Sequence, residues 1–388
     1  MIHALLFWSL RQQIRNGYPD FTIFYGAGKI VSQGMGHHLY DRALQYRVQE
    51  QFTHNVETRK AALPYNHPPF EALLFVPLSR LSYVGAYFSW NVLNLSALLL
   101  IIFVLRPHIA IVRSLPIAFW FLVALASFPV FVALLQGQDI LLFLLFLALT
   151  FASLKKGDDI SAGLWLGAGL FRFHLIVPVL LLFLVRKKWK GLLGFSIAAT
   201  VLALVSLFAV GWDSLRNYPG FVMNMERSLA QGSTIVTDMP SLRGLAGIFS
   251  PGGSVSSFIV VLLSVLVLGL AASRWRTSSG DLAFALAVVV TPLISYHTLA
   301  HDLSLLLIPL FLTLDFLREK EASNGLRAAL WVPAVFFTLM SPLQMILWFQ
   351  AGKYCLVAVV LLLWVYGLWR ASAIAGQKNL PATEVVAR

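Results

Sequence analysis

The chain has 388 residues, of which 59% are hydrophobic and only 12% are charged, and its mean hydropathy is +0.78. A soluble globular chain carries about 25% charged residues, so this composition excludes an ordinary soluble domain. The net charge of +12 does not indicate nucleic-acid binding, because the Lys and Arg residues lie in short clusters between apolar runs, where membrane topology places them.

Continuous apolar runs predict a chain that crosses a membrane many times as helices. A spanning helix needs about 20 mostly apolar residues, and the runs lack the alternation of barrel strands. The predicted fold class is therefore all-α, a polytopic helical membrane protein with a single domain over residues 1–388. The segments 160–171 and 174–186 are too short to cross alone, and they indicate either a pair of half-depth helices or two short spans in a thin region. In chain order the candidate spans are 84–105, 116–135, 140–154, 160–171, 174–186, 191–211, 255–274, 281–296, 303–317, 327–347 and 353–370.

The chain begins with an apolar stretch, residues 1–10, that Arg11 and Arg15 interrupt too early for a full span. Either the chain starts inside its first helix or this stretch lies at the membrane interface, and the sequence leaves both open. A polar segment, residues 18–70, follows as the first outer loop. Apolar residues at helical spacing within it predict amphipathic helices on the bilayer surface, and a structural cap over the bundle is the alternative.

The distribution of Lys and Arg predicts which loops face the cytoplasm. Basic residues gather in the short loops 106–115, 155–159, 186–190, 274–280 and 318–327, whereas the opposite short turns contain only Arg172. Cytoplasmic loops carry an excess of Lys and Arg, so the first set is predicted to be cytoplasmic. The polar segments 11–69 and 212–253 then face outward, and residues 371–388 form a cytoplasmic tail that is predicted to be disordered.

An ordered set of motifs extends over much of the chain and resembles a known family. The motifs are Asp20-Phe21-x-x-x-Tyr25-x-Ala27, Gly34, Leu39-Tyr40-Asp41, Tyr65-x-His67-Pro68-Pro69-Phe70, Gly137-Gln138, a Gly-rich helix from Gly163 to Arg172, Ser241-Leu242-Arg243-Gly244, and Ser295-Tyr296-His297 through His301-Asp302. Together they resemble glycosyltransferase family 87, whose members are integral-membrane GT-C enzymes and include polyprenyl-phosphate-mannose-dependent mannosyltransferases. The chain departs from the family pattern at Asp139, where Asn is usual, and at Arg172-Phe173-His174, where Lys-Pro is common.

The resemblance implies a GT-C-like bundle and an inverting hexosyltransferase. Its donor is then a polyprenyl-phosphate sugar, with mannose as the leading candidate for the sugar. Its acceptor is a lipid-linked or surface glycan on the outer face of the inner membrane. Two other classes stay open: a transporter or flippase of a lipid-linked sugar, which needs no base, and a non-catalytic membrane scaffold. No cofactor is expected, because a monophosphate leaving group needs a metal less than a diphosphate does, although a divalent metal stays an open alternative.

Asp20 is the predicted catalytic base. An acceptor hydroxyl loses its proton as it attacks the anomeric carbon, and a carboxylate at hydrogen-bonding distance takes that proton. Asp20 begins an outer helix just after the first apolar stretch, and the matching first-loop Asp has this role in the family that the chain resembles. The alternative is an ordinary helix N-cap.

Arg172, His297 and His301 are predicted to bind the donor phosphate. A lone Arg near membrane depth needs a partner. For Arg172 this is a lipid phosphate or an internal salt bridge, unless the side chain extends to the membrane interface. His297 and His301 are four residues apart and share one helical face. That spacing also suits a metal, but no helical Glu completes a zinc motif, and a pair of buried structural histidines is the other alternative.

Lower-ranked candidates for substrate binding share a position at the predicted outer face. They are Asp41, His67, Gln138, Asp139, Arg243 and Asp302. Asp41 is expected either to cap a helix or to bind sugar, and Asp302 either to orient a histidine or to cap the next helix. Cys355 is the only cysteine, so the sequence contains neither an internal disulfide nor a cysteine-based metal site.

Overall fold

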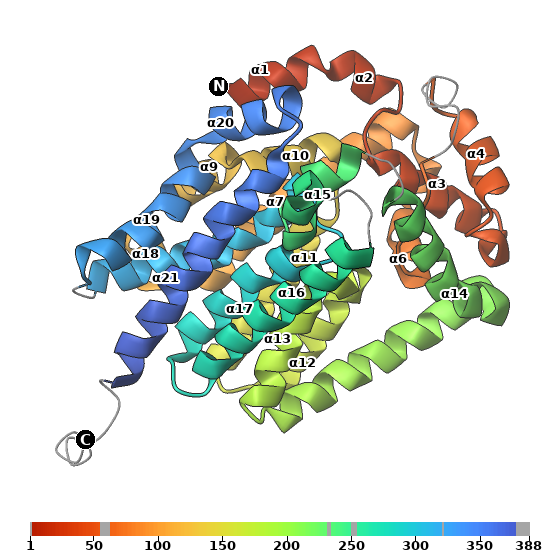
Figure 1. Cartoon of the computed structure of the whole chain (residues 1–388). Helices are drawn as coiled ribbons and strands as arrows, with labels where there is room; N and C mark the ends of the chain where they lie inside the picture. Colours follow the sequence, from red (N-terminus) through yellow and green to blue (C-terminus); the bar gives the residue numbers. More distant parts are fainter. Residues whose placement is uncertain (1, 55–62, 231–233, 250–253, 320–321, 378–388) are drawn as a thin grey trace.

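The computed structural model describes residues 2–54, 63–230, 234–249, 254–319 and 322–377. Within these ranges the chain folds into helices and turns without a strand, which confirms the predicted all-α class. The α-helices are α1 (Ile2–Ser9), α2 (Arg11–Arg15), α3 (Phe21–Ser32), α4 (Arg42–Glu50), α6 (Pro69–Phe75), α7 (Tyr83–Leu105), α8 (Ala110–Ser114), α9 (Ile117–Ala126), α10 (Phe128–Gln136), α11 (Ile140–Lys155), α12 (Asp159–Ala168), α13 (Phe173–Val185), α14 (Trp189–Ala230), α15 (Leu242–Phe249), α16 (Ser254–Trp275), α17 (Gly280–Ile294), α18 (Leu307–Glu319), α19 (Asn324–Leu339), α20 (Ser341–Met345) and α21 (Val357–Gln377) (Figure 1).

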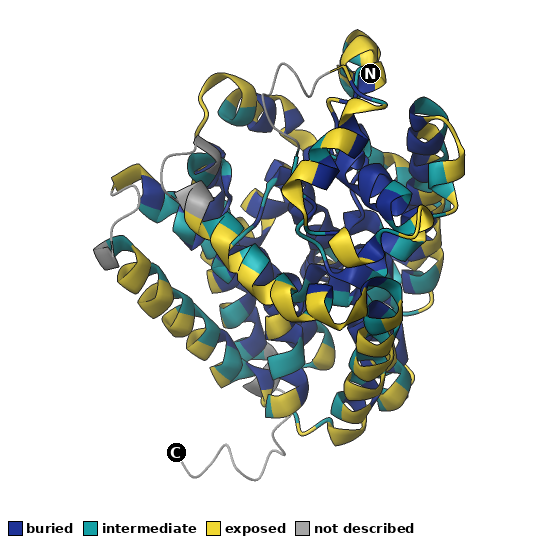
Figure 2. Cartoon of the chain, turned by 90° about the vertical axis from the view of Figure 1, so that its right-hand side faces the viewer, coloured by how far each residue is buried: buried dark blue, intermediate teal, exposed yellow. Residues whose placement is uncertain are grey.

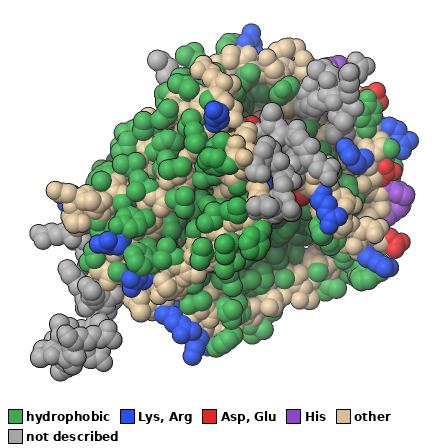
Figure 3. All heavy atoms as spheres, viewed as in Figure 1, with side chains coloured by type: hydrophobic (Ala, Val, Ile, Leu, Met, Phe, Trp, Pro, Cys, Tyr) green, Lys and Arg blue, Asp and Glu red, His purple; other side chains and the backbone are tan. Residues whose placement is uncertain are grey.

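Six segments in the described part of the chain are long and apolar enough to cross a membrane, or up to eight if two bent helix pairs each form one span. The apolar surface agrees with this, because Phe258 and Val265 on α16 are more than half exposed. Hydrophobic side chains cover most of the face seen in Figure 3. Buried residues lie along the central helices and exposed ones along the outer helices (Figure 2). The chain is therefore a multi-pass membrane protein.

Two of the candidate spans, 116–135 and 327–347, are each formed by a sharply bent pair of helices. The pair α9 and α10 is bent by 76°, and α19 is bent from the helical stretch after it by 75°. Each second helix has a proline in its first turn, Pro129 or Pro342. Proline has no backbone N–H and its ring clashes with the carbonyl four residues earlier, so it fits the first turn of a new helix but not the interior of a continuous one. The backbone accordingly leaves the helical region at Ser127 and Met340, two residues before each proline, and starts again in a new direction.

The stretch from α12 to α13 turns back on itself. Lys188, just after α13, forms an ion pair of 2.9 Å with Asp159 at the start of α12. Gly191 at the start of α14 lies against both Asp159 and Phe183. The two ends of the stretch therefore lie together, which fits both a pair of half-depth helices and two short spans. It is not one straight span, although its length and composition alone satisfy the criteria for one. Between the helices lies a 3-10 turn, η3 (Gly169–Arg172).

The basic loops meet at one end of the bundle. Lys155 at the end of α11 forms an ion pair of 2.9 Å with Asp281 at the start of α17. Arg186 at the end of α13 donates to the carbonyl oxygens of Trp275 and Ser278, 2.7 Å away in each case. The helices α11, α13 and α17 run side by side from this end toward the opposite one (Figure 1). They have 16, 13 and 15 residues, so at 1.5 Å per residue each is shorter than a hydrocarbon core of about 30 Å.

Two of the predicted polar segments contain more helix than expected. Helix α14 continues through the predicted outer segment 212–253 as far as Ala230, after a kink at Gly211, whose backbone has φ 77° and ψ 171°. Helix α21 continues to Gln377, so the start of the predicted disordered tail is helical. The rest of that tail, residues 378–388, lies outside the described residues.

Candidate active site

A polar cavity of about 110 Å³ lies at the end of the bundle opposite the basic loops. The turns before and after the short central helices line it, together with the segments that precede α3 and α6. Six of the polar side chains that line the cavity come from five different turns of the chain, because His297 and His301 share one. The six are Asp20, His67, Gln138, Arg172, His297 and His301. The fold therefore gathers the predicted base and the predicted phosphate-binding residues around one space.

The carboxylate of Asp20 does not cap a helix. Asp20 occupies the N-cap position of α3, but its side chain accepts no bond from the first turn. Its Oδ2 instead accepts a hydrogen bond of 2.9 Å from Nε2 of Gln138, and its backbone N–H donates to Gln136. Asp20 is half-buried and lines the cavity, so the N-cap alternative is wrong for its side chain.

Arg172 forms an internal salt-bridge network. Its Nε donates to Oδ1 of Asp139 at 2.8 Å, and one terminal nitrogen donates to Oδ1 of Asp302 at 3.1 Å. The other terminal nitrogen contacts Asp139 as well, and it donates to Oε1 of Gln138 at 2.5 Å. This is the internal salt bridge that the sequence left open. Two aspartates already neutralise the guanidinium, so it offers little free positive charge to a phosphate.

A second network surrounds Glu226 in the far part of α14. One carboxylate oxygen lies 2.9 Å from Nδ1 of His297, and the other lies 2.7 Å from Arg243. Arg243 also donates to the carbonyl oxygen of Tyr296. Arg243 thus holds Glu226, which lines the cavity, but does not line the cavity itself. The sequence analysis missed Glu226, because a Glu-Arg pair in a predicted outer segment is typical of a solvated charged surface.

A third cluster contains His67, Glu71 and Asp139. Nδ1 of His67 lies 2.7 Å from Glu71 and 3.8 Å from Asp139, and both carboxylates are fully buried. Burial lowers the pKa of His67 to about 3 and raises the pKa of Glu71 well above its ordinary value, with a further rise from Asp139. Burial opposes ionisation of Asp139, but Arg172 and then His67 outweigh it and lower its pKa. Glu71 was also missed as a candidate site residue. The sequence did offer one indication, because Glu71 is a carboxylate within an otherwise apolar stretch.

The remaining predicted residues lie beside the cavity or outside it. Asp302 accepts a bond of 2.8 Å from the backbone N–H of Leu299 and lies 3.5 Å from Nε2 of His301, so it supports both the turn and that histidine. Asp41 is exposed and caps α4 by accepting from Ala43 and Leu44. Asp41 is absent from the cavity lining.

An apolar groove of about 540 Å³ adjoins the polar cavity. The two spaces share Phe173, Val222, Glu226 and Tyr296 as a common wall. Arg227, which is exposed, also lines the groove. Ligand pockets typically have about 300–1,000 Å³, so the groove is large enough for a lipid chain segment, and its shared wall places such a segment next to polar side chains.

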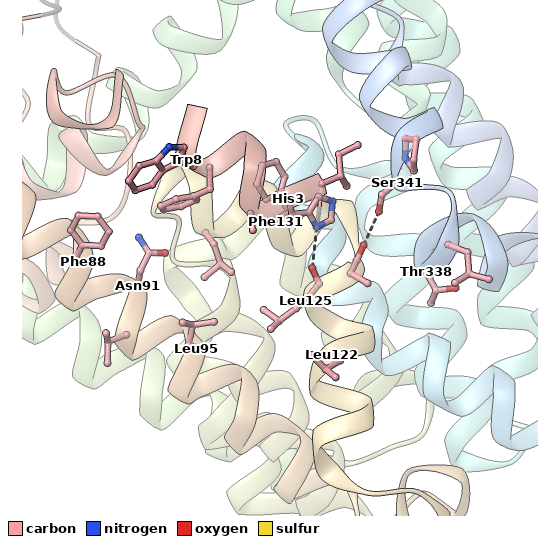
Figure 4. Close-up of a pocket in the computed structure, with 18 residues that line it drawn as sticks. His3, Trp8, Phe88, Asn91, Leu95, Leu122, Leu125, Phe131, Thr338 and Ser341 are labelled. Atoms are coloured by element: carbon pink, nitrogen blue, oxygen red, sulfur yellow. Dashed lines mark hydrogen bonds between the residues drawn. The ribbon is translucent and has the colours of Figure 1, made fainter. Parts of the chain in front are cut away.

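A larger apolar cavity of about 890 Å³ lies elsewhere, between α1 and the helices α7, α9 and α19 (Figure 4). His3 stacks on Phe131 there and lies 3.1 Å from the carbonyl oxygen of Leu125. None of the predicted site residues lines this cavity. The polar cavity therefore remains the candidate active site.

Comparison with known protein families tests the resemblance. The sequence profile of glycosyltransferase family 87 matches residues 65–295. The matched stretch includes Gln138, Arg172 and Arg243, whereas Asp20 lies well before its start and His301 lies shortly after its end. No curated protein matches the chain. Since the matched stretch covers more than half of its length, the chain belongs to glycosyltransferase family 87 and is a membrane glycosyltransferase.

Proposed function

We propose that this GT-C-like enzyme transfers a hexose, first of all mannose, from a polyprenyl-phosphate donor to a lipid-linked or surface glycan, with inversion at the anomeric carbon. One observation carries the proposal: a polar cavity that contains a carboxylate, Asp20, shares a wall with an apolar groove. A donor with a lipid tail and a polar head needs these two environments side by side. A transporter would not need the carboxylate, and a scaffold would not need the cavity.

Asp20 is the base in the proposed reaction. It takes the proton of the acceptor hydroxyl while the hydroxyl oxygen attacks the anomeric carbon, and the bond from that carbon to the phosphate oxygen breaks. Gln138 donates to Asp20 at 2.9 Å and holds the carboxylate in place. Attack opposite the leaving phosphate inverts the anomeric carbon. The electron pair of the broken bond leaves with the polyprenyl phosphate, which is a stable anion.

The phosphate is proposed to lie near the shared wall of the groove and the cavity. His297 and His301 line the cavity, and Arg227 lines the groove. These side chains surround the place where a lipid phosphate would emerge from the groove. We assign phosphate binding to them before Arg172, because Arg172 is already bound to two aspartates. The role of Arg172 is then to position Asp139 and Gln138.

The cavity is proposed to face the exterior side of the inner membrane. The basic loops lie at the other end of the bundle, where Lys155, Arg186 and Lys188 gather. Such loops are usually cytoplasmic. The acceptor glycan would then be met outside the cell or in the periplasm.

Transfer of radiolabelled mannose from polyprenyl-phosphate mannose to a membrane extract tests the proposal. Removal of a general base typically costs about 10²–10⁴ in rate, so we expect Asp20→Asn to lower kcat by that range with little change in KM for the donor. Glu50→Gln, an exposed carboxylate in the same outer segment, is the matched control and should transfer label normally. Equal label transfer by Asp20→Asn and the wild type would overturn the role of Asp20. Lack of transfer by the wild type with mannose and with other hexose donors would overturn the donor class.

A further inference from the structure

His67, Glu71 and Asp139 bring three possible metal ligands together beside the polar cavity. Nδ1 of His67, one oxygen of Glu71 and one oxygen of Asp139 all lie within 4.8 Å of one another. His67 and Glu71 are four residues apart, on either side of Pro68 and Pro69, and Asp139 comes from the turn between α10 and α11. Both carboxylates have no exposed surface.

The polar atoms of this cluster have no well-aligned partner within the described part of the chain. Nδ1 of His67, both carboxylate oxygens of Glu71 and Oδ2 of Asp139 are buried and meet no partner with hydrogen-bond geometry, although Nδ1 of His67 lies only 2.7 Å from one oxygen of Glu71. Most buried polar atoms in proteins have a hydrogen-bond partner. The two oxygens of Asp139 have different neighbours. Arg172 binds Oδ1, whereas Oδ2 faces His67 and the rest of the cluster. A further group at the centre of the cluster would satisfy all four atoms.

The charges around the cluster do not balance. Glu71, Asp139 and Asp302 are three fully buried carboxylates, and within the described residues the one guanidinium paired with any of them is that of Arg172, which binds Asp139 and Asp302. With all three carboxylates ionised, as metal binding requires, and His67 neutral, the network carries two uncompensated negative charges; without a cation, burial and Asp139 raise the pKa of Glu71 instead. Buried charges are usually paired or bound to metal. One divalent cation would bring this network to neutrality.

We propose that His67, Glu71 and Asp139 bind one divalent metal ion of the zinc or manganese class. An imidazole nitrogen with carboxylate oxygens suits these metals, whereas magnesium and calcium prefer oxygen ligands alone. Two ligands that each lie about 2.1 Å from one zinc ion are at most about 4.2 Å apart. The present separations therefore need only a small side-chain movement. Three protein ligands also leave a tetrahedral zinc ion with one further position.

This site follows from the buried charges of the chain and does not depend on which sugar the enzyme transfers. Its effect on the neighbouring cavity is electrostatic. Arg172 is neutralised by Asp139 and Asp302, so the cavity needs another source of positive charge if an anionic group is to enter it. A metal held by His67, which lines the cavity, would cancel the excess negative charge of the network that otherwise repels such a group.

Metal content of the full-length protein tests the proposal. The protein is purified in detergent with a tag that contains no histidine, treated with chelator, desalted, and incubated with zinc, manganese or magnesium chloride. We expect the wild type to retain about one equivalent of zinc or manganese per chain and little magnesium, measured by mass spectrometry of the metals after gel filtration. Chelation should also lower the Tm of the wild type, and zinc or manganese should restore it.

Variants of the ligands separate this site from adventitious binding. Loss of a group that merely supports a metal ligand costs about 10–100-fold in affinity, so Glu71→Gln and His67→Gln should each weaken binding at least tenfold and make the Tm insensitive to metal. Glu226→Gln is the matched control, because Glu226 also lies beside a histidine, at 2.9 Å, but is paired with Arg243. It should retain the metal.

Two results would overturn the site. One is a wild-type protein that retains no more metal than Glu71→Gln. The other is an infrared band of a protonated carboxylic acid that is present in the wild type after metal loading and lost in Glu71→Gln, because a proton would then occupy the cluster. A protein that binds the metal but transfers no mannose would contradict the proposed function and leave the metal site intact.

Discussion

Arg172 joins two aspartates that are far apart in the sequence. Asp139 precedes α11, Asp302 precedes α18, and both are fully buried with the guanidinium between them. A buried ion pair adds little stability over a hydrophobic alternative, but removing one partner leaves an unpaired buried charge. The network therefore serves mainly to fix the positions of Asp139 and Gln138 in the site.

Replacement of Arg172 tests this structural role. We expect Arg172→Met to lower the free energy of unfolding by about 3–5 kcal/mol, because it leaves two buried carboxylates without their partner. The measurement is the thermal unfolding of the purified protein in detergent. Arg106→Met, which removes an Arg at the end of α7 outside this network, is the control and should change the transition little. A transition for Arg172→Met close to that of the wild type would show that the network does not hold the site together.

Some residues of the candidate site could be predicted from the sequence, and others could not. Arg172 and His297 are predictable because each is a polar group in a short turn between apolar runs, and Asp20 because it begins an outer helix and matches the first motif of the family. The partners of Arg172 could not be predicted, because the separations to Asp139 and Asp302 are 33 and 130 residues. Glu71 was hidden for a different reason, since it lies in the first turn of a short helix, where an acidic residue is ordinary.

At the scale of single helices, α12 and α14 pack closely through small residues. A Cβ on Gly163 would overlap the carbonyl oxygen of Gly191, and a Cβ on Gly194 would overlap that of Ile160. Gly163 and Gly167 have the spacing that lets helices approach closely in membranes. This contact holds the helical hairpin that carries η3, and therefore Arg172, in position.

Substitution of Gly163 tests the contact. We expect Gly163→Ala to destabilise the protein by about 1–3 kcal/mol, because the packed backbone of α14 must move to accept a methyl group. Gly269→Ala on α16 is the control, since nothing lies within 4 Å of a Cβ at that position, and it should be neutral or slightly stabilising. The measurement is the Tm of each variant relative to the wild type, determined by thermal unfolding under the same conditions. The same shift for both would contradict the proposed close contact.

Gly211 redirects α14 toward the polar cavity. Its backbone, with φ 77° and ψ 171°, is in a region that is essentially restricted to glycine. Beyond this residue the helix carries Tyr218, Glu226 and Arg227 to the wall of the groove. The kink is thus the element that joins a long lipid-facing helix to the polar cavity.

The effect of this kink is measurable in enzyme kinetics. We expect Gly211→Ala to cost about 1–3 kcal/mol in backbone strain and to raise KM for the lipid-linked donor, because relief of the strain would move the groove wall. Gly220→Ala lies in the same helix with open space around its Cβ and should leave KM unchanged. Unaltered donor kinetics in Gly211→Ala would show that the kink does not shape the groove.

The helix positions were largely predictable, and their bends were not. Apolar runs predict α7, α11 and α16 to within a few residues, because long hydrocarbon segments have only one satisfactory backbone arrangement in a membrane. The run that forms α9 and α10 is equally apolar on both sides of its break. Its hydropathy therefore hides the 76° bend, and only Pro129 signals it.

At the scale of the whole molecule, the basic loops and the polar cavity occupy opposite ends of the bundle. The short helices α11, α13 and α17 separate them. Because these helices are shorter than the hydrocarbon core, the cavity is expected to lie below the membrane surface on its side. The arrangement gives a definite orientation to test.

Chemical labelling of cysteines tests this orientation. The single native cysteine, Cys355, is buried, so its background labelling should be low. We expect a membrane-impermeant maleimide added to intact cells to label Glu50→Cys in the outer segment and to spare Lys156→Cys in a basic loop until the cells are opened. Both positions are exposed, so accessibility of the side chain is matched. The reverse pattern would place the cavity in the cytoplasm.

The wall that the groove shares with the cavity has a consequence for turnover. If the donor is lipid-linked, as proposed, a carrier in the groove would reach the reaction centre laterally from one leaflet and leave the same way, so its sugar would not cross bulk water. Two-dimensional diffusion and the mole fraction of carrier in that leaflet, rather than any bulk concentration, would then set how often the enzyme meets its donor. Diluting the bilayer with inert lipid at constant total carrier should slow such an enzyme, whereas diluting the suspension with buffer should not.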